Sequence, residues 1–174
     1  MTTFSATIDK PWLDVVPIRV GHMRAGLATP DRYLTATVGG QRVRLDLYGG
    51  NDPCPFEEAS EWRGWLVVGW RGHVHWVDLA GRAVKSFALG SSFGRLYPAP
   101  DALFATSAER LFRFGTTGEL VWSSGVLGID GVVLESWSGD VLAGLGEWDP
   151  PDGWRPFRVD RGTGASAGTE PDDP

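Results

Sequence analysis

The chain has 174 residues, which at about 100 to 200 residues per domain predicts a single domain. Hydrophobic residues make up 42% and charged residues 22%, a composition that supports a buried core and excludes a disordered or fibrous protein. The formal charge is −6, so the chain is repelled on average by phosphates, and we expect neither nucleic acid nor an anionic membrane as a general partner.

Cysteine content and the two ends of the chain predict a cytoplasmic protein. Cys54 is the only cysteine, which excludes an intramolecular disulfide and a cysteine-based zinc site. The first ten residues lack the pattern of a signal peptide, and the longest apolar run, residues 65–68, is too short to cross a bilayer. Residues 162–174 are small, polar or acidic, so we expect a domain over residues 1–161 and a disordered tail behind it.

A glycine-closed β-hairpin is the first element that the sequence predicts. Strands expected at residues 33–38 and 41–48 flank Gly39 and Gly40, which supply the positive φ angles of a two-residue hairpin turn. Apolar and polar residues alternate in the second strand, so one face should be buried and the other wet. The buried set is Val43, Leu45 and Leu47, and the wet set is Arg44, Asp46 and Tyr48.

Residues 49–63 are expected to form a long loop, because they include glycine, asparagine, aspartate, two prolines and three glutamates. The only helical turn that the sequence suggests lies within this stretch, at residues 56–62. Over the whole chain, 24 glycines and 12 prolines interrupt short apolar segments too closely for ordinary helices, which predicts an all-β fold.

From residue 65 onward the chain repeats one plan: apolar strands followed by a turn that ends in glycine. The turn glycines are Gly81, Gly118 and Gly164, spaced by about 40 residues, as in the blades of a β-propeller. An inserted loop at residues 148–154 lengthens the third unit. The expected strands are 66–69, 74–78 and 83–89 in the first unit, 103–106, 111–114 and 120–122 in the second, and 141–144 and 156–160 in the third.

One segment of the second repeat carries a resemblance to a known family. Residues 112–122, Phe-Arg-Phe-Gly-Thr-Thr-Gly-Glu-Leu-Val-Trp, resemble the blade motif of quinoprotein-type bacterial β-propellers, in which an apolar strand, a small polar turn with glycine and a strand ending in tryptophan follow one another. Residues 77–81 and 159–164 are similar. The resemblance covers roughly residues 65–164, implies a blade-like repeat and implies no cofactor.

The fold expected from these elements is all-β, with antiparallel blade-like repeats in a small or partial β-propeller. Three repeats and the hairpin give at most four blades, the low end for a closed ring. A partial ring completed by a second copy of the chain, and a twisted antiparallel β-sandwich, are the alternatives, because an open array leaves strand edges to be covered.

The inserted loop of the third repeat is the predicted binding site. Two prolines restrict its backbone and two tryptophans flank its acids, so the loop offers aromatic anchors at low entropic cost. The alternative is that the tryptophans only pack over the end of the third repeat. The predicted binding residues are Glu147, Trp148, Asp149, Asp152 and Trp154.

His73 and His75 are the candidate metal ligands. They lie two residues apart in a predicted strand, so both imidazoles share one face and are able to bind one transition metal. The simplest sheet places Val74, Trp76 and Asp78 on the opposite, buried face, which makes the histidine face wet. Two solvated strand histidines without a metal, and thus no cofactor, are therefore the favoured interpretation.

These observations predict a non-catalytic protein-binding module. An acidic single domain is steered toward basic proteins, and the most concrete version is an immunity-type inhibitor of a basic bacterial toxin or enzyme. A metal-dependent enzyme using His73 and His75, and a propeller that binds a small molecule at its axis, are the alternatives. The chain is also able to form a homo-oligomer, whereas a small-molecule-binding propeller is expected to be a monomer with a central pocket.

Overall fold

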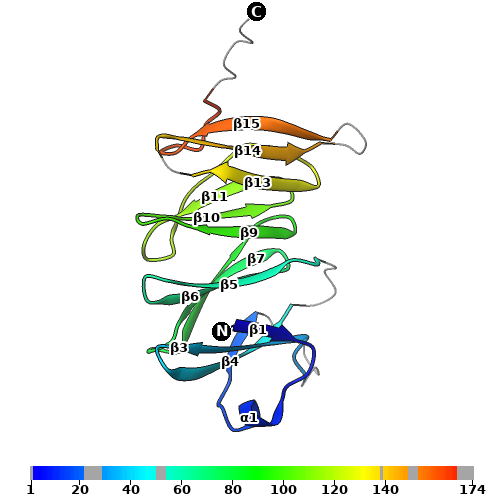
Figure 1. Ribbon diagram of the computed structural model, residues 1–174, viewed down its shortest axis with the longest axis vertical. Helices are drawn as coiled ribbons and strands as arrows, with labels where there is room; N and C mark the ends of the chain where they lie inside the picture. Colours follow the sequence, from blue (N-terminus) through cyan, green and yellow to red (C-terminus); the bar gives the residue numbers. More distant parts are fainter. Residues whose placement is uncertain (1, 22–28, 50–53, 138, 149–152, 168–174) are drawn as a thin grey trace, which may run out of the picture.

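Four small β-sheets follow one another along the length of the molecule, from sheet A at the N-terminal end to sheet D at the C-terminal end (Figure 1). The structure is a computed structural model that describes residues 2–21, 29–49, 54–137, 139–148 and 153–167. Almost all of its regular structure is β-strand, which confirms the all-β prediction.

Sheet A contains the predicted hairpin. Its strands are β1 (Thr2–Ser5), β2 (Ile18–Gly21), β3 (Arg32–Val38) and β4 (Gln41–Tyr48), in the order β1-β3-β4-β2, with β2 parallel to β4. The hairpin turn between β3 and β4 has φ angles of 55° at Gly39 and 80° at Gly40. Both are in the left-handed region, as predicted. Within the described part of the chain, the only helix is α1 (Lys10–Leu13), which lies between β1 and β2.

Sheets B, C and D are antiparallel, and their strands are neighbours in the order of the chain. Sheet B contains β5 (Glu57–Trp62), β6 (Trp65–Trp70), β7 (His73–Asp78) and β8 (Ala83–Ala88). Sheet C contains β9 (Phe93–Pro98), β10 (Leu103–Ser107), β11 (Leu111–Phe114) and β12 (Leu120–Ser123). Sheet D contains β13 (Gly131–Ser136), β14 (Val141–Glu147) and β15 (Trp154–Asp160).

Every strand predicted for the three repeats is present, but the first strand of each of these sheets was missed. The helical turn expected at residues 56–62 is wrong, because residues 57–62 form β5 and pair with β6 along its whole length. Strand β5 is only half buried, so its sequence lacks a continuous apolar pattern. Strands β9 and β13 were also missed. Glycine, arginine and proline interrupt the apolar pattern in β9, and glycine and glutamate interrupt it in β13.

Three hydrophobic clusters, one between each pair of neighbouring sheets, form the core. The middle sheets are therefore apolar on both faces. In β6, Leu66 and Val68 pack toward sheet A, whereas Val67 packs toward sheet C. In β10, Leu103 packs toward sheet B and Phe104 toward sheet D. The sequence of such a strand is a continuous apolar run, which is why β6 and β10 could be predicted from the sequence.

Two of the predicted turn glycines fix the spacing of neighbouring sheets. Gly118 has a φ of 79°, and a Cβ at this position would lie 2.8 Å from the ring of Trp76 in sheet B. Gly164 has a φ of 72°, and its Cβ would lie 2.5 Å from the ring of Trp122 in sheet C. Both turns therefore need glycine, for the backbone angle and for the contact with a tryptophan of the preceding sheet.

The array is open. Sheets A and D lie at opposite ends of the molecule, so they do not meet to close a ring (Figure 1). The predicted partial array of blade-like repeats is therefore the observed fold. None of the described helices is long and apolar enough to cross a membrane.

The polar face of β4 differs from the prediction. Asp46 and Tyr48 were expected to face solvent, yet they are only 5% and 6% exposed. Arg44 forms an ion pair with Asp46, with 2.8 Å between Nε and Oδ1, and donates a hydrogen bond to the backbone oxygen of Trp12 in α1. A layer of paired polar groups and the α1 segment thus covers this face, which alternation of residue type alone does not predict.

The C-terminal boundary also lies further along the chain than expected. Gly164 donates a backbone hydrogen bond to Asp160, and Ser166 forms an isolated β-bridge with Val159. The domain predicted for residues 1–161 therefore extends at least to residue 167. Residues 168–174 of the predicted tail lie outside the described part of the chain.

Candidate binding groove between sheets C and D

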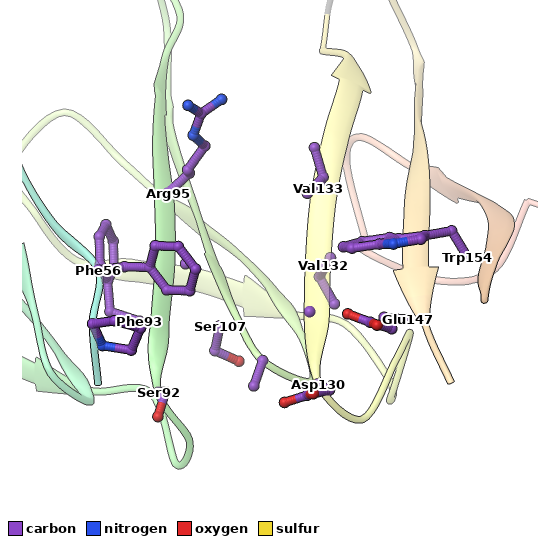
Figure 2. Close-up of a pocket in the computed structure, with 14 residues that line it drawn as sticks. Phe56, Ser92, Phe93, Arg95, Ser107, Asp130, Val132, Val133, Glu147 and Trp154 are labelled. Atoms are coloured by element: carbon purple, nitrogen blue, oxygen red, sulfur yellow. The ribbon is translucent and has the colours of Figure 1, made fainter. Parts of the chain in front are cut away.

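A cavity of about 420 Å³ opens between the first strands of sheets C and D. We call it the CD groove. Its walls come from β9 on one side and β13 on the other, with the start of β15 reaching over β13 (Figure 2). Because these strands are the first of their sheets, the groove lies at sheet edges, where side chains and backbone are both accessible.

Aromatic side chains from three parts of the chain line the CD groove. Phe56 precedes β5, Phe93 starts β9 and Trp154 starts β15. Figure 2 shows the two phenylalanines on one side of the groove and Trp154 on the other. Phe56 is 59% exposed and Trp154 is 45% exposed, which is unusual for such large apolar groups and typical of binding surfaces.

Two carboxylates lie at one end of the CD groove. Glu147 ends β14 and Asp130 precedes β13, and the backbone oxygen of Glu147 accepts hydrogen bonds from the amides of Ile129 (2.7 Å) and Asp130 (3.3 Å). These bonds hold the two acids on neighbouring segments of the chain, and Figure 2 shows both below Trp154. Arg95 lines the opposite part of the groove, so the negative charge is concentrated at the Trp154 end.

Strand register and a glycine allow the indole of Trp154 to lie beside Glu147. Trp154 is directly opposite Glu147 in the β14–β15 pair, and Glu147 is opposite Gly131 in the β13–β14 pair. A Cβ at position 131 would lie 2.9 Å from Cη2 of Trp154 and 3.6 Å from Oε2 of Glu147. The absence of a side chain at Gly131 therefore leaves room for the indole beside the carboxylate.

The structure divides the binding loop that the sequence predicted. It brings Glu147 and Trp154 together in the CD groove, whereas Trp148 lines a separate cavity of about 210 Å³ with Leu127 and Phe157. Asp149 and Asp152 lie outside the described residues. Phe56, Phe93 and Asp130 also line this groove, and sequence reasoning missed them because they are far apart in the chain and meet only through the stacking of sheets C and D.

The candidate metal ligands do not both face solvent as expected. His73 and His75 do share one face of β7, and their rings stack with centroids 5.6 Å apart and planes 10° from parallel. His75, however, is only 2% exposed, because the central strand β7 is covered on both faces by the neighbouring sheets. The expectation that these histidines are solvated is therefore wrong for His75.

The buried imidazole of His75 is kept neutral. Burial, and secondarily the neighbouring His73, lower the pKa of His75 from 6.5 to about 3. Its Nδ1 lies 2.8 Å from the hydroxyl oxygen of Ser86, whereas Nε2 is buried without a hydrogen-bond partner. Among the described residues, no group of three or more histidine, cysteine, aspartate or glutamate side chains is arranged to hold a metal ion.

Comparison of the sequence with protein-family models gives no match, and comparison with curated proteins gives none either. The resemblance of residues 65–164 to quinoprotein-type blades therefore stays a prediction. The class of protein is defined by the fold alone, as an open array of four blade-like β-sheets with an aromatic and acidic groove at its edge.

Proposed function

We propose that the protein is a non-catalytic binding module that takes a cationic side chain of a basic partner protein into the CD groove. The observation that carries this proposal is the placement of Glu147 directly across from the half-exposed indole of Trp154, with Asp130 on the adjoining segment. Carboxylates beside an aromatic face are the groups that recognise a lysine or arginine side chain, through charge-assisted hydrogen bonds and a cation–π contact.

The net charge of the chain also supports a basic partner. The net charge of −6 steers positively charged proteins toward this chain and raises their association rate. Tryptophan is also one of the residues most often found at the energetic centre of protein interfaces. An immunity-type inhibitor of a basic toxin or enzyme fits this description and stays a prediction.

The test is binding of a defined probe at the groove. The probe is a short acetylated and amidated peptide with one central arginine, and the same peptide with the neutral isostere citrulline is its control. Intrinsic fluorescence, together with the fluorescence of the Trp154→Phe variant, reports on the indole. We expect saturable binding of the arginine peptide and at least about a tenfold loss of affinity with citrulline, because a hydrogen bond to a charged group contributes roughly 1.5 to 3 kcal/mol.

Matched variants assign the binding to the groove. Glu147→Gln and Asp130→Asn are expected to weaken binding of the arginine peptide, whereas Glu135→Gln should leave it unchanged. Glu135 is an exposed acid on the same strand, β13, but it does not line the groove. Equal binding of both peptides, or equal losses in all three variants, would contradict the proposal.

The predicted metal-dependent enzyme has less support. His75 has one nitrogen next to Ser86 and lies between packed sheets, so a metal there would have to displace the packing of sheets A and B. Elemental analysis of the purified chain tests this alternative directly. A stoichiometric transition metal that is lost in a His73→Ala, His75→Ala double variant would favour it over the binding module.

A further inference from the structure

The charged side chains of the CD groove have opposite signs at its two ends. Asp130 and Glu147 lie at one end, below Trp154, whereas Arg95 of β9 lies toward the other end, where Val133 lines the groove (Figure 2). Arg95 and Asp130 are exposed, and Glu147 is half-buried. The groove is therefore polarised along its length.

These three charged groups have no partner within the described part of the chain. None of them forms a hydrogen bond or an ion pair through its side chain. Other arginines of sheets C and D behave differently, since Arg113 and the β15-terminal Arg161 both pair with Asp101. The charges of the groove are thus left available for a ligand, with the positive and negative groups kept apart.

The edges of the groove offer side chains more than backbone. The amide of Leu96 in β9 donates a hydrogen bond to Oε2 of Glu58 (2.9 Å), and the amide of Leu134 in β13 donates one to the hydroxyl oxygen of Tyr97 (3.1 Å). Both amides belong to the first strand of a sheet, where an added strand would otherwise pair. Because they are occupied, recognition of a segment in the groove depends mainly on side chains.

We propose that the partner segment in the CD groove carries two opposite charges, with an arginine or lysine at the Glu147 end and a carboxylate at the Arg95 end. This inference rests on the proposed function, because it starts from a cationic side chain beside Glu147. A purely basic segment would place further positive charge near Arg95, whereas a carboxylate gains an ion pair there. An acidic side chain and a C-terminus are the two sources of such a carboxylate.

The length of the groove sets the spacing of the two charges. Residues 130 and 133 both line it and are three residues apart, which corresponds to about 10 Å in an extended chain. In an extended peptide, residues two positions apart are separated by about 7 Å and point to the same side. Their long side chains widen this span, so an arginine followed two positions later by a carboxylate matches the groove.

A pair of peptides tests the proposal against the effect of net charge. Both are acetylated and amidated and contain one arginine, and two positions later one has glutamate and the other glutamine. Because the chain has a net charge of −6, overall attraction favours the more positive glutamine peptide. We expect the opposite order: at low ionic strength the glutamate peptide binds about twofold to fivefold more tightly, as one exposed ion pair allows, and added salt reduces the difference.

Variants of one arginine assign the preference to its place in the groove. Arg95→Gln is expected to abolish the preference for glutamate and to bind the glutamine peptide at least as tightly as the unmodified chain. Arg95→Lys keeps the charge and should keep most of the preference. Arg155→Gln is the matched control, because it removes the same charge from an exposed position of β15 that does not line the groove.

A third peptide distinguishes the two sources of the carboxylate. It ends two positions after the arginine, with a free C-terminus in place of the glutamate side chain. A gain with this peptide identifies a chain end, and a gain with the glutamate peptide alone identifies an internal acidic residue.

Two results would overturn the inference: binding of the glutamine peptide as tight as that of both carboxylate peptides, or a preference for carboxylate that persists in Arg95→Gln. In either case, binding of the arginine-containing peptides would still support the proposed function. Absence of binding by all three peptides would contradict both the inference and the proposed function.

Discussion

The two end sheets of the array differ in the residues of their uncovered faces. Each end sheet has one face that no neighbouring sheet covers. The outer face of sheet A carries Arg44, Asp46 and Tyr48. Arg44 is paired with Asp46 and donates a hydrogen bond to the α1 segment, so that these polar groups find partners within the chain.

On the outer face of sheet D, which points away from sheet C, Val141, Ala143 and Leu145 of the central strand lie beside Arg158 and Asp160 of β15, and no segment of the described chain is known to cover them. The difference shows that the residue pattern of a strand does not by itself reveal whether the chain covers the outer face of an end sheet.

Further cation–π contacts reinforce the cover of sheet A. The guanidinium of Arg44 lies 5.5 Å from the ring centre of Tyr33, and that of Arg42 lies 5.9 Å from the ring centre of Trp12. Repeat proteins commonly need end units with polar outer faces to remain soluble. Sheet A has the properties of such a capping unit, because its charged outer residues are paired within the chain.

The largest expected effect comes from breaking the cover of sheet A. Asp46→Ala leaves the guanidinium of Arg44, whose side chain is only 13% exposed, without its carboxylate. Removal of one member of a buried ion pair typically costs about 3 to 5 kcal/mol, so we expect a loss of unfolding free energy near the lower value, since Arg44 keeps its bond to Trp12. Denaturant unfolding monitored by circular dichroism measures it.

The double variant Arg44→Met, Asp46→Leu sharpens this test. It removes both charges at once and leaves apolar groups of similar size, so much of the stability lost in Asp46→Ala should return. If the double variant is no more stable than Asp46→Ala, the polar layer is not a paired cover, and the contrast between the two ends loses its physical basis.

An intermediate effect is expected from His75, which lies on the face of sheet B that covers sheet A. The pKa of His75 is about 3 in the folded chain and near 6.5 when unfolded, so the unfolded chain binds the additional proton as the pH falls. His75 therefore removes about 1.4 kcal/mol of stability for each pH unit between about 6 and 3.

A pH series of unfolding curves for the chain and for His75→Phe isolates this contribution. All other titrating groups are common to both, so the difference between the two profiles should be flat above pH 7 and steepen toward acid in favour of the variant. Parallel profiles would mean that His75 is accessible to protons in the folded state. The three histidines are at positions 22, 73 and 75, so sheet D contributes no such acid sensitivity.

The sequence was informative where the structure admits only one type of residue at a position or along a strand. Gly39 and Gly40 mark the hairpin through their backbone angles, and Gly118 and Gly164 mark turns that also contact a tryptophan. Strands β6 and β10 were found because burial on both faces makes them continuously apolar. In each case the requirement shows in the residue types of the segment itself, even where a sheet from another part of the chain imposes it.

What the sequence did not predict depends on how sheets stack. Strand β5 is a half-buried first strand, so its residues resemble a loop. Asp46 and His75 occupy strand positions that alternate with apolar residues, a pattern that predicts exposure to water. Both are buried, because segments from other parts of the chain cover them. Likewise, Glu147 and Trp154 were found because they flank one loop, whereas Phe56 and Asp130 join the groove only through the placement of sheets C and D.

The smallest expected effect compares two leucines on the middle strands of the end sheets. Leu45 of β4 faces sheet B and is fully buried, so Leu45→Ala should cost about 2 to 5 kcal/mol of unfolding free energy. Leu145 of β14 lies on the outer face of sheet D and belongs to no core cluster, so Leu145→Ala should cost less than about 1 kcal/mol. Denaturant unfolding of both variants under the same conditions measures the two costs. Equal losses in Leu45→Ala and Leu145→Ala would contradict the comparison, because they would mean that the outer face of sheet D is packed as tightly as the face between sheets A and B.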